Sequence, residues 1–292
     1  MRIVCRALLA LAVPTIPATA RMEAPMPQHD FTQMKAVHSV AGMERAVVRP
    51  NLVYRTVGGQ ALEMDVYSPP DAAAPLAAVI LVHGGPVPAQ ARPKDWGVFV
   101  SYGRMLAASG LVAVAFNHRF HDPAMLPDAG SDVAAAVDHV RSHAATLGID
   151  KDRIAIWAFS GGGPFLSLPL RGGWPFVRAL VAYYAVLDLQ VPPPGASSGI
   201  GTELRQEFSP LRHVPDSDGH RPSFFIARAG RDNTWLNASI DRFVQEALAR
   251  NLALELMTHP SGQHGFDILD DDARSREIID RTLAFLRRRL AE

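Results

Sequence analysis

The sequence predicts an α/β protein with a mostly parallel central sheet and helices on both faces. Short apolar runs suited to buried strands alternate along the chain with amphipathic helical patterns. Gly and Pro are scattered between these segments rather than repeated. The 292 residues, 48% of them hydrophobic, are enough for one large α/β domain with a sizeable core.

The charge balance argues against a nucleic-acid partner. The chain has 29 basic and 29 acidic residues and a formal net charge of +0, so no basic excess is available to neutralise phosphates. Its only cysteine, Cys5, lies close to the N-terminus. The domain that follows is therefore expected to contain neither a disulfide nor a thiol nucleophile.

The first 20 residues have the pattern of a secretory signal peptide. Arg2 and Arg6 precede an apolar run over residues 7–13, which is too short to span a bilayer. Small residues at 18 and 20 suit a cleavage site, and we expect cleavage after Ala20. This predicts a secreted or periplasmic protein with no membrane-embedded part.

Three regions are expected after the signal peptide. Residues 21–48 contain two prolines and a weak helical pattern, which predicts a loosely packed arm. The domain itself is expected over residues 49–292. Within it, the segment at about 190–222 is rich in Pro, Gly and Ser and is too long for an ordinary connection. We expect this segment to form a small lid over a site.

The domain is expected to begin with an antiparallel hairpin and to continue with buried strands. Alternating runs at residues 52–57 and 62–67 flank Gly58-Gly59, which is a hairpin signature. Continuous apolar runs are typical of strands buried on both faces. They predict further strands over residues 77–82, 111–116, 154–158, 179–187, 224–227 and 252–257.

Four longer helices are expected between and after these strands. Residues 132–147, for example, place Val133, Val137 and Val140 on one face at spacings of three and four. Gly110 and Gly148 stand where glycines end helices. The expected helices cover residues 96–109, 132–147, 236–250 and 273–290.

Ser160 is the candidate nucleophile. The apolar strand over residues 154–158 ends in Phe159-Ser160 followed by three glycines, which is how hydrolases build a nucleophile elbow. The usual G-x-S-x-G pattern has Ala158 in place of its first glycine. The alternative is a phosphate-binding glycine loop. That alternative lacks the lysine of a P-loop and any G-x-G-x-x-G pattern.

A serine nucleophile needs a base, and histidine suits neutral pH. The α/β-hydrolase order of serine, acid and histidine places the base after Ser160, so His213, His220, His259 and His264 qualify. His264 lies in a loop after the last expected strand and is our candidate. His259, at the end of that strand, is interpreted as structural.

The acid that orients the histidine is expected to be Asp232. It ends the penultimate strand, 32 residues before the histidine (264 − 232). Asp188 also ends an expected strand and is the competitor. Asp267 lies so close in sequence to His264 that it is badly placed to reach across the ring.

Backbone N–H groups are expected to form an oxyanion hole. His83-Gly84-Gly85-Pro86 follows the strand over residues 77–82. Gly161, directly after the nucleophile, supplies one N–H, and Gly84 or Gly85 supplies the second. Pro86 has no N–H and stiffens the loop.

The candidate positions are expected to converge. Ser160, His83, Asp232 and His264 each follow the carboxyl end of an expected strand, and open α/β sheets bind ligands beyond that edge. Residues 117–122 contain two histidines and an aspartate, but not three or four ligands at a recognised zinc spacing. Neither a metal nor an organic cofactor is expected.

Taken together, the motifs resemble the α/β-hydrolase superfamily over residues 52–290. The resemblance is carried by His83-Gly84-Gly85-Pro86, residues 148–154, Ser160-Gly161-Gly162, Gly230-Arg231-Asp232 and His264-Gly265-Phe266. Within the superfamily, the chain is similar to dienelactone-hydrolase-like and feruloyl-esterase-like carboxylesterases. It is also similar to the catalytic domain of prolyl-oligopeptidase-type peptidases. The resemblance implies the α/β-hydrolase fold.

We therefore expect a serine hydrolase that cleaves a small-molecule carboxylic ester through an acyl-enzyme. One alternative is a prolyl-oligopeptidase-like peptidase, although those relatives place a large propeller where this chain has about 50 residues. Another is a non-catalytic binding protein on the same fold, using Ala158 and the long 190–222 segment. Substrate specificity is expected to depend on that segment and on residues 86–104.

Overall fold

The computed structural model describes residues 30–72, 74–190, 199–216 and 221–292. Phe31–Glu292 form one compact unit. The expected signal peptide, residues 21–29 of the expected arm and parts of the expected lid lie outside the described residues, and the expectations for them stay predictions.

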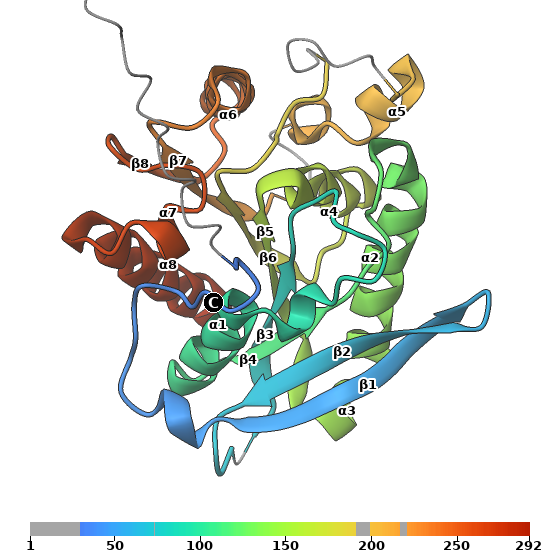
Figure 1. Ribbon diagram of the computed structural model, residues 1–292, viewed down its shortest axis with the longest axis vertical. Helices are drawn as coiled ribbons and strands as arrows, with labels where there is room; N and C mark the ends of the chain where they lie inside the picture. The colour runs from blue at the N-terminus through green and yellow to red at the C-terminus, as the bar shows by residue number, and fades with distance from the viewer. Residues whose placement is uncertain (1–29, 73, 191–198, 217–220) are drawn as a thin grey trace, which may run out of the picture. The chain divides into compact units, whose positions relative to one another are not determined.

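An eight-stranded sheet forms the centre of this unit (Figure 1). Its spatial order is β1-β2-β4-β3-β5-β6-β7-β8, and β2 alone runs against its neighbours. The strands are β1 (Val47–Val57), β2 (Gln60–Ser68), β3 (Leu76–Val82), β4 (Val112–Phe116), β5 (Ile149–Phe159), β6 (Val177–Tyr183), β7 (Ser223–Ala229) and β8 (Leu254–His259). The predicted mostly parallel sheet with an N-terminal antiparallel hairpin is confirmed.

Helices cover both faces of the sheet, as predicted (Figure 1). Helices α1 and α8 pack on one face, and α2, α3 and α6 pack on the other. The α-helices are α1 (Gly97–Ala108), α2 (Leu126–Ser142), α3 (Ala144–Leu147), α4 (Ser167–Gly172), α5 (Thr202–Glu207), α6 (Thr234–Ala249), α7 (Phe266–Leu269) and α8 (Ala273–Ala291). Among the described residues, no helix is both long and apolar enough to cross a membrane.

The β1–β2 turn shows why the hairpin could be read from sequence. Gly58 and Gly59 have φ angles of 55° and 82°, and Val57 pairs with Gln60. A two-residue hairpin turn needs positive φ at both central positions, which glycine adopts without steric cost.

The strand expected over residues 179–187 is shorter, because β6 ends at Tyr183. The next three residues leave the sheet but stay in the core, and Ala185 has no exposed surface. Tyr184 has a φ of 36°, and its N–H donates to the Ala227 carbonyl at 2.8 Å. The apolar pattern correctly predicted that these residues are buried. Such a pattern does not distinguish a buried loop from a strand.

The helix expected over residues 132–147 is two helices in the structure. Helix α2 begins earlier, at Leu126, with Pro127 in its first turn. N–H groups in the first turn have no partner within the helix, so the missing N–H of proline costs no hydrogen bond there. It ends at Ser142, and the one-turn helix α3 follows after His143. The apolar spacing continues across this break because both helices pack on the same face of the sheet.

The N-terminal arm is more firmly packed than its sequence predicts. From Phe31 onward it belongs to the compact unit. Ala36 is buried, and apolar side chains from the rest of the arm pack against the same core as helices α1 and α8. These are Val37, Val40, Met43 and Ala46.

Candidate active site

Strand β5 lies in the centre of the sheet and presents Ser160 at its carboxyl end. Ser160 has a φ of 50°, an uncommon conformation for a residue with a side chain. Its carbonyl accepts the Val186 N–H at 3.0 Å, and a 3₁₀ helix, Ser160–Leu166, follows at once. A strained backbone conformation of this kind persists only where the surrounding structure holds it in place, as at a nucleophile elbow.

The glycines after Ser160 let the elbow touch the neighbouring loop backbone. A Cβ on Gly161 would overlap the Gly85 carbonyl oxygen, and one on Gly162 would stand 2.6 Å from the His83 carbonyl oxygen. A Cβ on Gly84 would stand 2.9 Å from the Cβ of Ser160. Contacts this short require glycine, so the loop after β3 lies directly against the serine.

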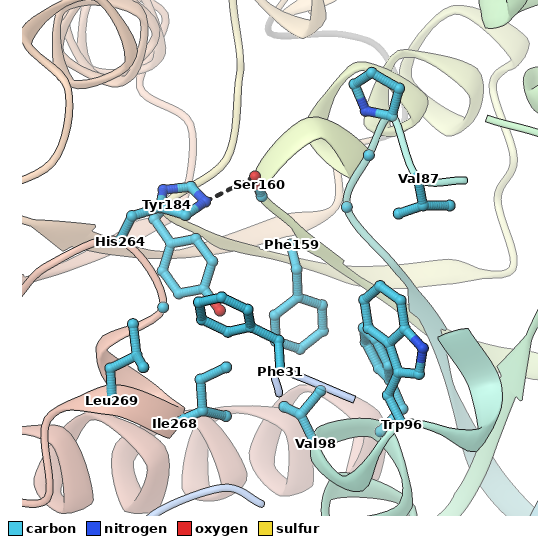
Figure 2. A pocket seen from close by; sticks show the side chains of 15 residues that line it. Phe31, Val87, Trp96, Val98, Phe159, Ser160, Tyr184, His264, Ile268 and Leu269 are labelled. Carbon is cyan, nitrogen blue, oxygen red and sulfur yellow. Dashed lines mark hydrogen bonds between the residues drawn. The ribbon is translucent and has the colours of Figure 1, made fainter. Parts of the chain in front are cut away.

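A hydrogen-bonded chain joins Ser160, His264 and Asp232. The Nε2 atom of His264 lies 2.8 Å from Ser160 Oγ, and Nδ1 lies 2.7 Å from Asp232 Oδ2 (Figure 2 shows the serine contact). A carboxylate oxygen accepts, so the contact places the donating N–H on Nδ1 of His264. Nε2 is then free to accept the serine proton.

Two loops that bond to each other hold the acid and the base. Gly230 N–H donates to the His259 carbonyl at 2.8 Å, and Arg231 N–H donates to the Gly262 carbonyl at 2.9 Å. Asn233 N–H also donates to Asp232 Oδ1 at 2.6 Å. The Asp232 side chain is only 4% exposed, whereas the His264 side chain is 43% exposed, so the acid is buried and the histidine borders the solvent.

The competing residues have other partners. Asp188 is buried and accepts from Arg242 Nε at 2.7 Å. His259 is buried and lies 3.1 Å from the carboxylate of Asp272, which caps helix α8. Of the remaining two histidines after the serine, His213 lies within hydrogen-bond distance of the backbone carbonyls of Gln206 and Glu207, and His220 lies outside the described residues.

A second carboxylate near His264 was not assigned a role from the sequence. Asp267 is fully buried and accepts from Tyr102 Oη at 2.7 Å and from Tyr184 Oη at 2.6 Å. The Tyr184 ring lies 4.7 Å from the His264 ring, centroid to centroid. Burial raises the pKa of Asp267, and the two tyrosine hydroxyls oppose that rise. The three residues form a buried polar support behind the histidine.

A largely apolar pocket of about 290 Å³ opens beside Ser160 and His264 (Figure 2). Aromatic and aliphatic side chains from separate parts of the chain form its walls. These are Phe31, Val87, Trp96, Val98, Phe99, Phe159, Tyr184, Ile268 and Leu269. Gly84 and Gly85 line it beside the serine. Pockets with apolar walls and a few polar groups at one end are typical of small-molecule sites.

Part of this wall was expected and part was not. Residues 86–104, expected to shape specificity, supply Trp96 among others. The described parts of the expected lid, including α5, contribute no side chain to the wall. Phe208 from that segment instead packs against Phe165, with ring centroids 6.3 Å apart. The wall contains Phe31 from the arm, which no sequence motif indicated.

His83 begins the glycine loop and stacks on a second buried histidine. The rings of His83 and His118 lie 3.6 Å apart, centroid to centroid, and are nearly parallel. His83 Nδ1 lies 2.6 Å from the Gly84 carbonyl oxygen, which requires Nδ1 to be the donor. Burial lowers the pKa of His83 to about 4 and lowers that of His118 well below its ordinary value. Both rings are neutral at pH 7.

The segment considered as a metal cluster supports this loop. Arg119 forms a bidentate pair with the buried Asp132, at 2.8 and 2.9 Å. The Phe120 carbonyl accepts the Val87 N–H at 2.9 Å. Among the described residues, no group of three or more His, Cys, Asp or Glu is placed to hold a metal ion.

Comparisons with known proteins match this architecture. Residues 64–169 match the BD-FAE family model. No match was found among curated proteins. The native structure of esterase 2 from Thermogutta terrifontis is 24% identical, with a TM-score of 0.67, covering 84% of this chain and 92% of the esterase.

Two further solved structures are similar to this chain. A truncated carbohydrate esterase from gut microbiota is 20% identical, with a TM-score of 0.69, covering 84% of this chain and 97% of that one. Thermogutta terrifontis esterase 2 phosphorylated by paraoxon is 23% identical, with a TM-score of 0.63 and coverages of 83% and 92%. The predicted α/β-hydrolase fold is confirmed.

Proposed function

We propose that this protein hydrolyses carboxylic esters, with Ser160 as nucleophile, His264 as general base and acid, and Asp232 as the orienting acid. The observation that carries the proposal is the hydrogen-bonded chain from Asp232 through His264 to Ser160 at the end of an apolar pocket. A serine hydroxyl becomes a useful nucleophile when an oriented imidazole accepts its proton.

In the first half of the reaction, Ser160 Oγ attacks the ester carbonyl carbon and its proton moves to His264 Nε2. Asp232 keeps the imidazole in the required tautomer and stabilises the imidazolium that forms. His264 then gives the proton to the leaving alkoxide, and the carbon–oxygen bond of the ester breaks. The products at this stage are a free alcohol and an acyl group on Ser160.

The developing negative charge falls on the former carbonyl oxygen. Gly161 N–H and an N–H from Gly84 or Gly85 are proposed to donate to it. The Gly84 backbone lies against Ser160 and the Gly161 backbone lies against Gly85, because the missing Cβ atoms allow the close approach described above. Such donors stabilise a transition state by about 3 kcal/mol each when they are aimed at the oxyanion.

In the second half, water replaces the alcohol and His264 takes a proton from it. The hydroxide attacks the acyl carbon through a second oxyanion held by the same N–H groups. The acid leaves, Ser160 regains its proton from His264, and the starting state is restored. Every proton in this scheme moves between substrate, water, Ser160 and His264.

The named relatives support the ester substrate. All three structures are of esterases, two of the Thermogutta terrifontis enzyme and one of the enzyme from gut microbiota. The Thermogutta enzyme is also described as phosphorylated by paraoxon. Paraoxon is therefore a suitable probe for a reactive serine in this chain.

Our first prediction tests the nucleophile. Paraoxon should add one phosphoryl group to the folded protein at Ser160, and Ser160→Ala should remove both this adduct and at least about 10⁴-fold of the esterase activity. Intact mass, peptide mapping and turnover of 4-nitrophenyl butyrate measure these outcomes. Ser167→Ala is the matched control, because this buried serine begins α4 and lies off the pocket.

Two results would reject the proposal. Full esterase activity in Ser160→Ala would show that Ser160 is not the nucleophile and would reject the mechanism. A wild-type protein that neither reacts with paraoxon nor turns over any ester would favour the non-catalytic binding alternative. Faster turnover of amino-acyl 4-nitroanilides than of matched esters would instead favour the peptidase.

A further inference from the structure

Phe31 stands apart from the other side chains of the pocket because it comes from the N-terminal arm, before the first strand of the sheet. It lies on the N-terminal arm, 16 residues before β1 begins (47 − 31). Figure 2 shows its ring among Tyr184, Phe159 and Val98, within the pocket that opens on Ser160. The remaining wall comes from loops at the sheet edge, from the α1 region and from the α7 region.

Two backbone hydrogen bonds fix the arm between opposite walls of the pocket. Gly97 N–H, at the start of α1, donates to the Thr32 carbonyl at 2.8 Å. Val37 N–H donates to the Asp267 carbonyl in α7, also at 2.8 Å. Asp267 is the carboxylate behind Tyr184, so the arm is bonded to the same element that supports His264.

Gly97 is the residue that permits this path. A Cβ at Gly97 would stand 2.7 Å from the carbonyl oxygens of both Gln33 and Met34. Real Cβ atoms essentially never approach backbone that closely, so the arm lies against α1 only because residue 97 has no side chain. The contact is to backbone and cannot be relieved by a side-chain rotation.

The exposed part of the Phe31 ring is available to contact a substrate in the pocket. Phe31 is 51% exposed, although the pocket wall around it includes buried Phe99 and Phe159. A single exposed apolar residue is common on protein surfaces, but this one faces the cavity beside the candidate nucleophile. A substrate group that fills the pocket would remove the open part of the ring from water.

We propose that Phe31 is a specificity-determining residue through which the N-terminal arm selects esters with a large apolar group over short ones. This rests on the proposed esterase function. The pocket volume of about 290 Å³ suits a group such as a phenylalkyl chain. An aromatic ring packs against such a group face to edge or offset, and a two-carbon group is too short to gain from that contact.

The test compares matched substrates on wild type, Phe31→Ala and Phe31→Leu. One series varies the acyl group, from 4-nitrophenyl acetate to 4-phenylbutyrate, and the other varies the alcohol, from methyl to benzyl butyrate. We expect Phe31→Ala to lower the large-to-small ratio of kcat/KM by about tenfold in one series. Phe31→Leu should recover part of the ratio, because it restores apolar contact. The loss should lie mainly in KM.

Leu248→Ala is the matched control. Leu248 is 62% exposed on helix α6 and does not line the pocket, so its removal should leave both ratios at wild-type values. Equal ratios in Phe31→Ala and wild type, in both series, would overturn the proposal. So would a loss of the same size in Leu248→Ala.

A second variant tests the path of the arm rather than the ring. Gly97→Ala should displace residues 31–34 and lower the ratio in the same series as Phe31→Ala. The ratio in the double variant should then be only slightly lower than in either single variant, because both changes remove the same contact. Fully additive losses would show that Phe31 acts without the arm contact at Gly97 and would overturn this part of the proposal.

A binding measurement separates this inference from the proposed chemistry. In the Ser160→Ala background, ethyl 4-phenylbutyrate should bind about tenfold more weakly when Phe31→Ala is added, as measured by calorimetry. This outcome does not require turnover. A wild-type protein without esterase activity would reject the proposed function while the binding difference still supports the role of Phe31. Equal binding with and without Phe31 would reject that role.

Discussion

Ala158 occupies the position at which the elbow pattern has its first glycine. It has no exposed surface and pairs with Val82 on one side and Ala182 on the other. The strand on which it lies keeps regular pairing up to Phe159, and the elbow turn comes only at Ser160. The methyl group is therefore accommodated before the turn, where the backbone needs no glycine.

Our second prediction follows for Ala158→Gly. We expect kcat/KM for 4-nitrophenyl butyrate to stay within about twofold of wild type, because the positive φ is at Ser160 and not at Ala158. Stability should fall by about 1 kcal/mol, since glycine in a strand loses more conformational entropy on folding. Urea unfolding and steady-state kinetics measure the two effects. A large gain in kcat would show that the methyl group distorts the elbow.

Some site residues were open to prediction from sequence, and others were not. Ser160 and His264 could be predicted, because the order of the motifs and the ends of the strands are local features of the chain. Phe31 and Tyr184 were not, because their places in the pocket depend on contacts with Gly97 and Asp267 that only the folded chain creates. These tertiary contacts have no sequence motif from which they could be predicted.

At the scale of elements, Asp267 ties three segments together. Its carboxylate in α7 accepts from Tyr102 in α1 and from Tyr184 after β6, and its carbonyl accepts from Val37 in the arm. Tyr184 is 6% exposed, and burial raises its pKa well above the ordinary value, so the hydroxyl stays a donor. These bonds fix the wall on which His264 rests.

The third prediction tests this junction with two matched changes. Tyr184→Phe and Tyr102→Phe each remove one donor from the buried carboxylate and should each cost about 1–3 kcal/mol of unfolding free energy. Because both donate to the same group, the double variant should not be the sum of the single variants. Urea unfolding of the three proteins and wild type gives the coupling. Simple additivity, or no loss in either single variant, would contradict the shared role of Asp267.

At the scale of the whole molecule, acid should weaken the fold through two buried histidines. His83 and His118 stack under the glycine loop, and their pKa values lie below the ordinary value of about 6.5 because burial disfavours the charged ring. Below about pH 6.5 the unfolded chain therefore binds protons that the folded protein does not. Their contribution is fully present above that pH and is lost as the pH falls through the lowered pKa of each ring, which for His83 is about 4.

The fourth prediction isolates His118. Its two ring nitrogens have no hydrogen-bond partner among the described residues, and aromatic rings of Phe116, Phe120 and Phe165 surround it. His118→Phe should keep the pH 7 stability within about 1 kcal/mol, since no bond of the ring is lost. Between pH 6 and 4.5 its unfolding free energy should fall less steeply than that of wild type, by up to about 1.4 kcal/mol per pH unit. Urea unfolding at several pH values measures both slopes. Identical slopes would mean that His118 takes up its proton in the folded protein as readily as in the unfolded chain, and burial would then not be what keeps it neutral.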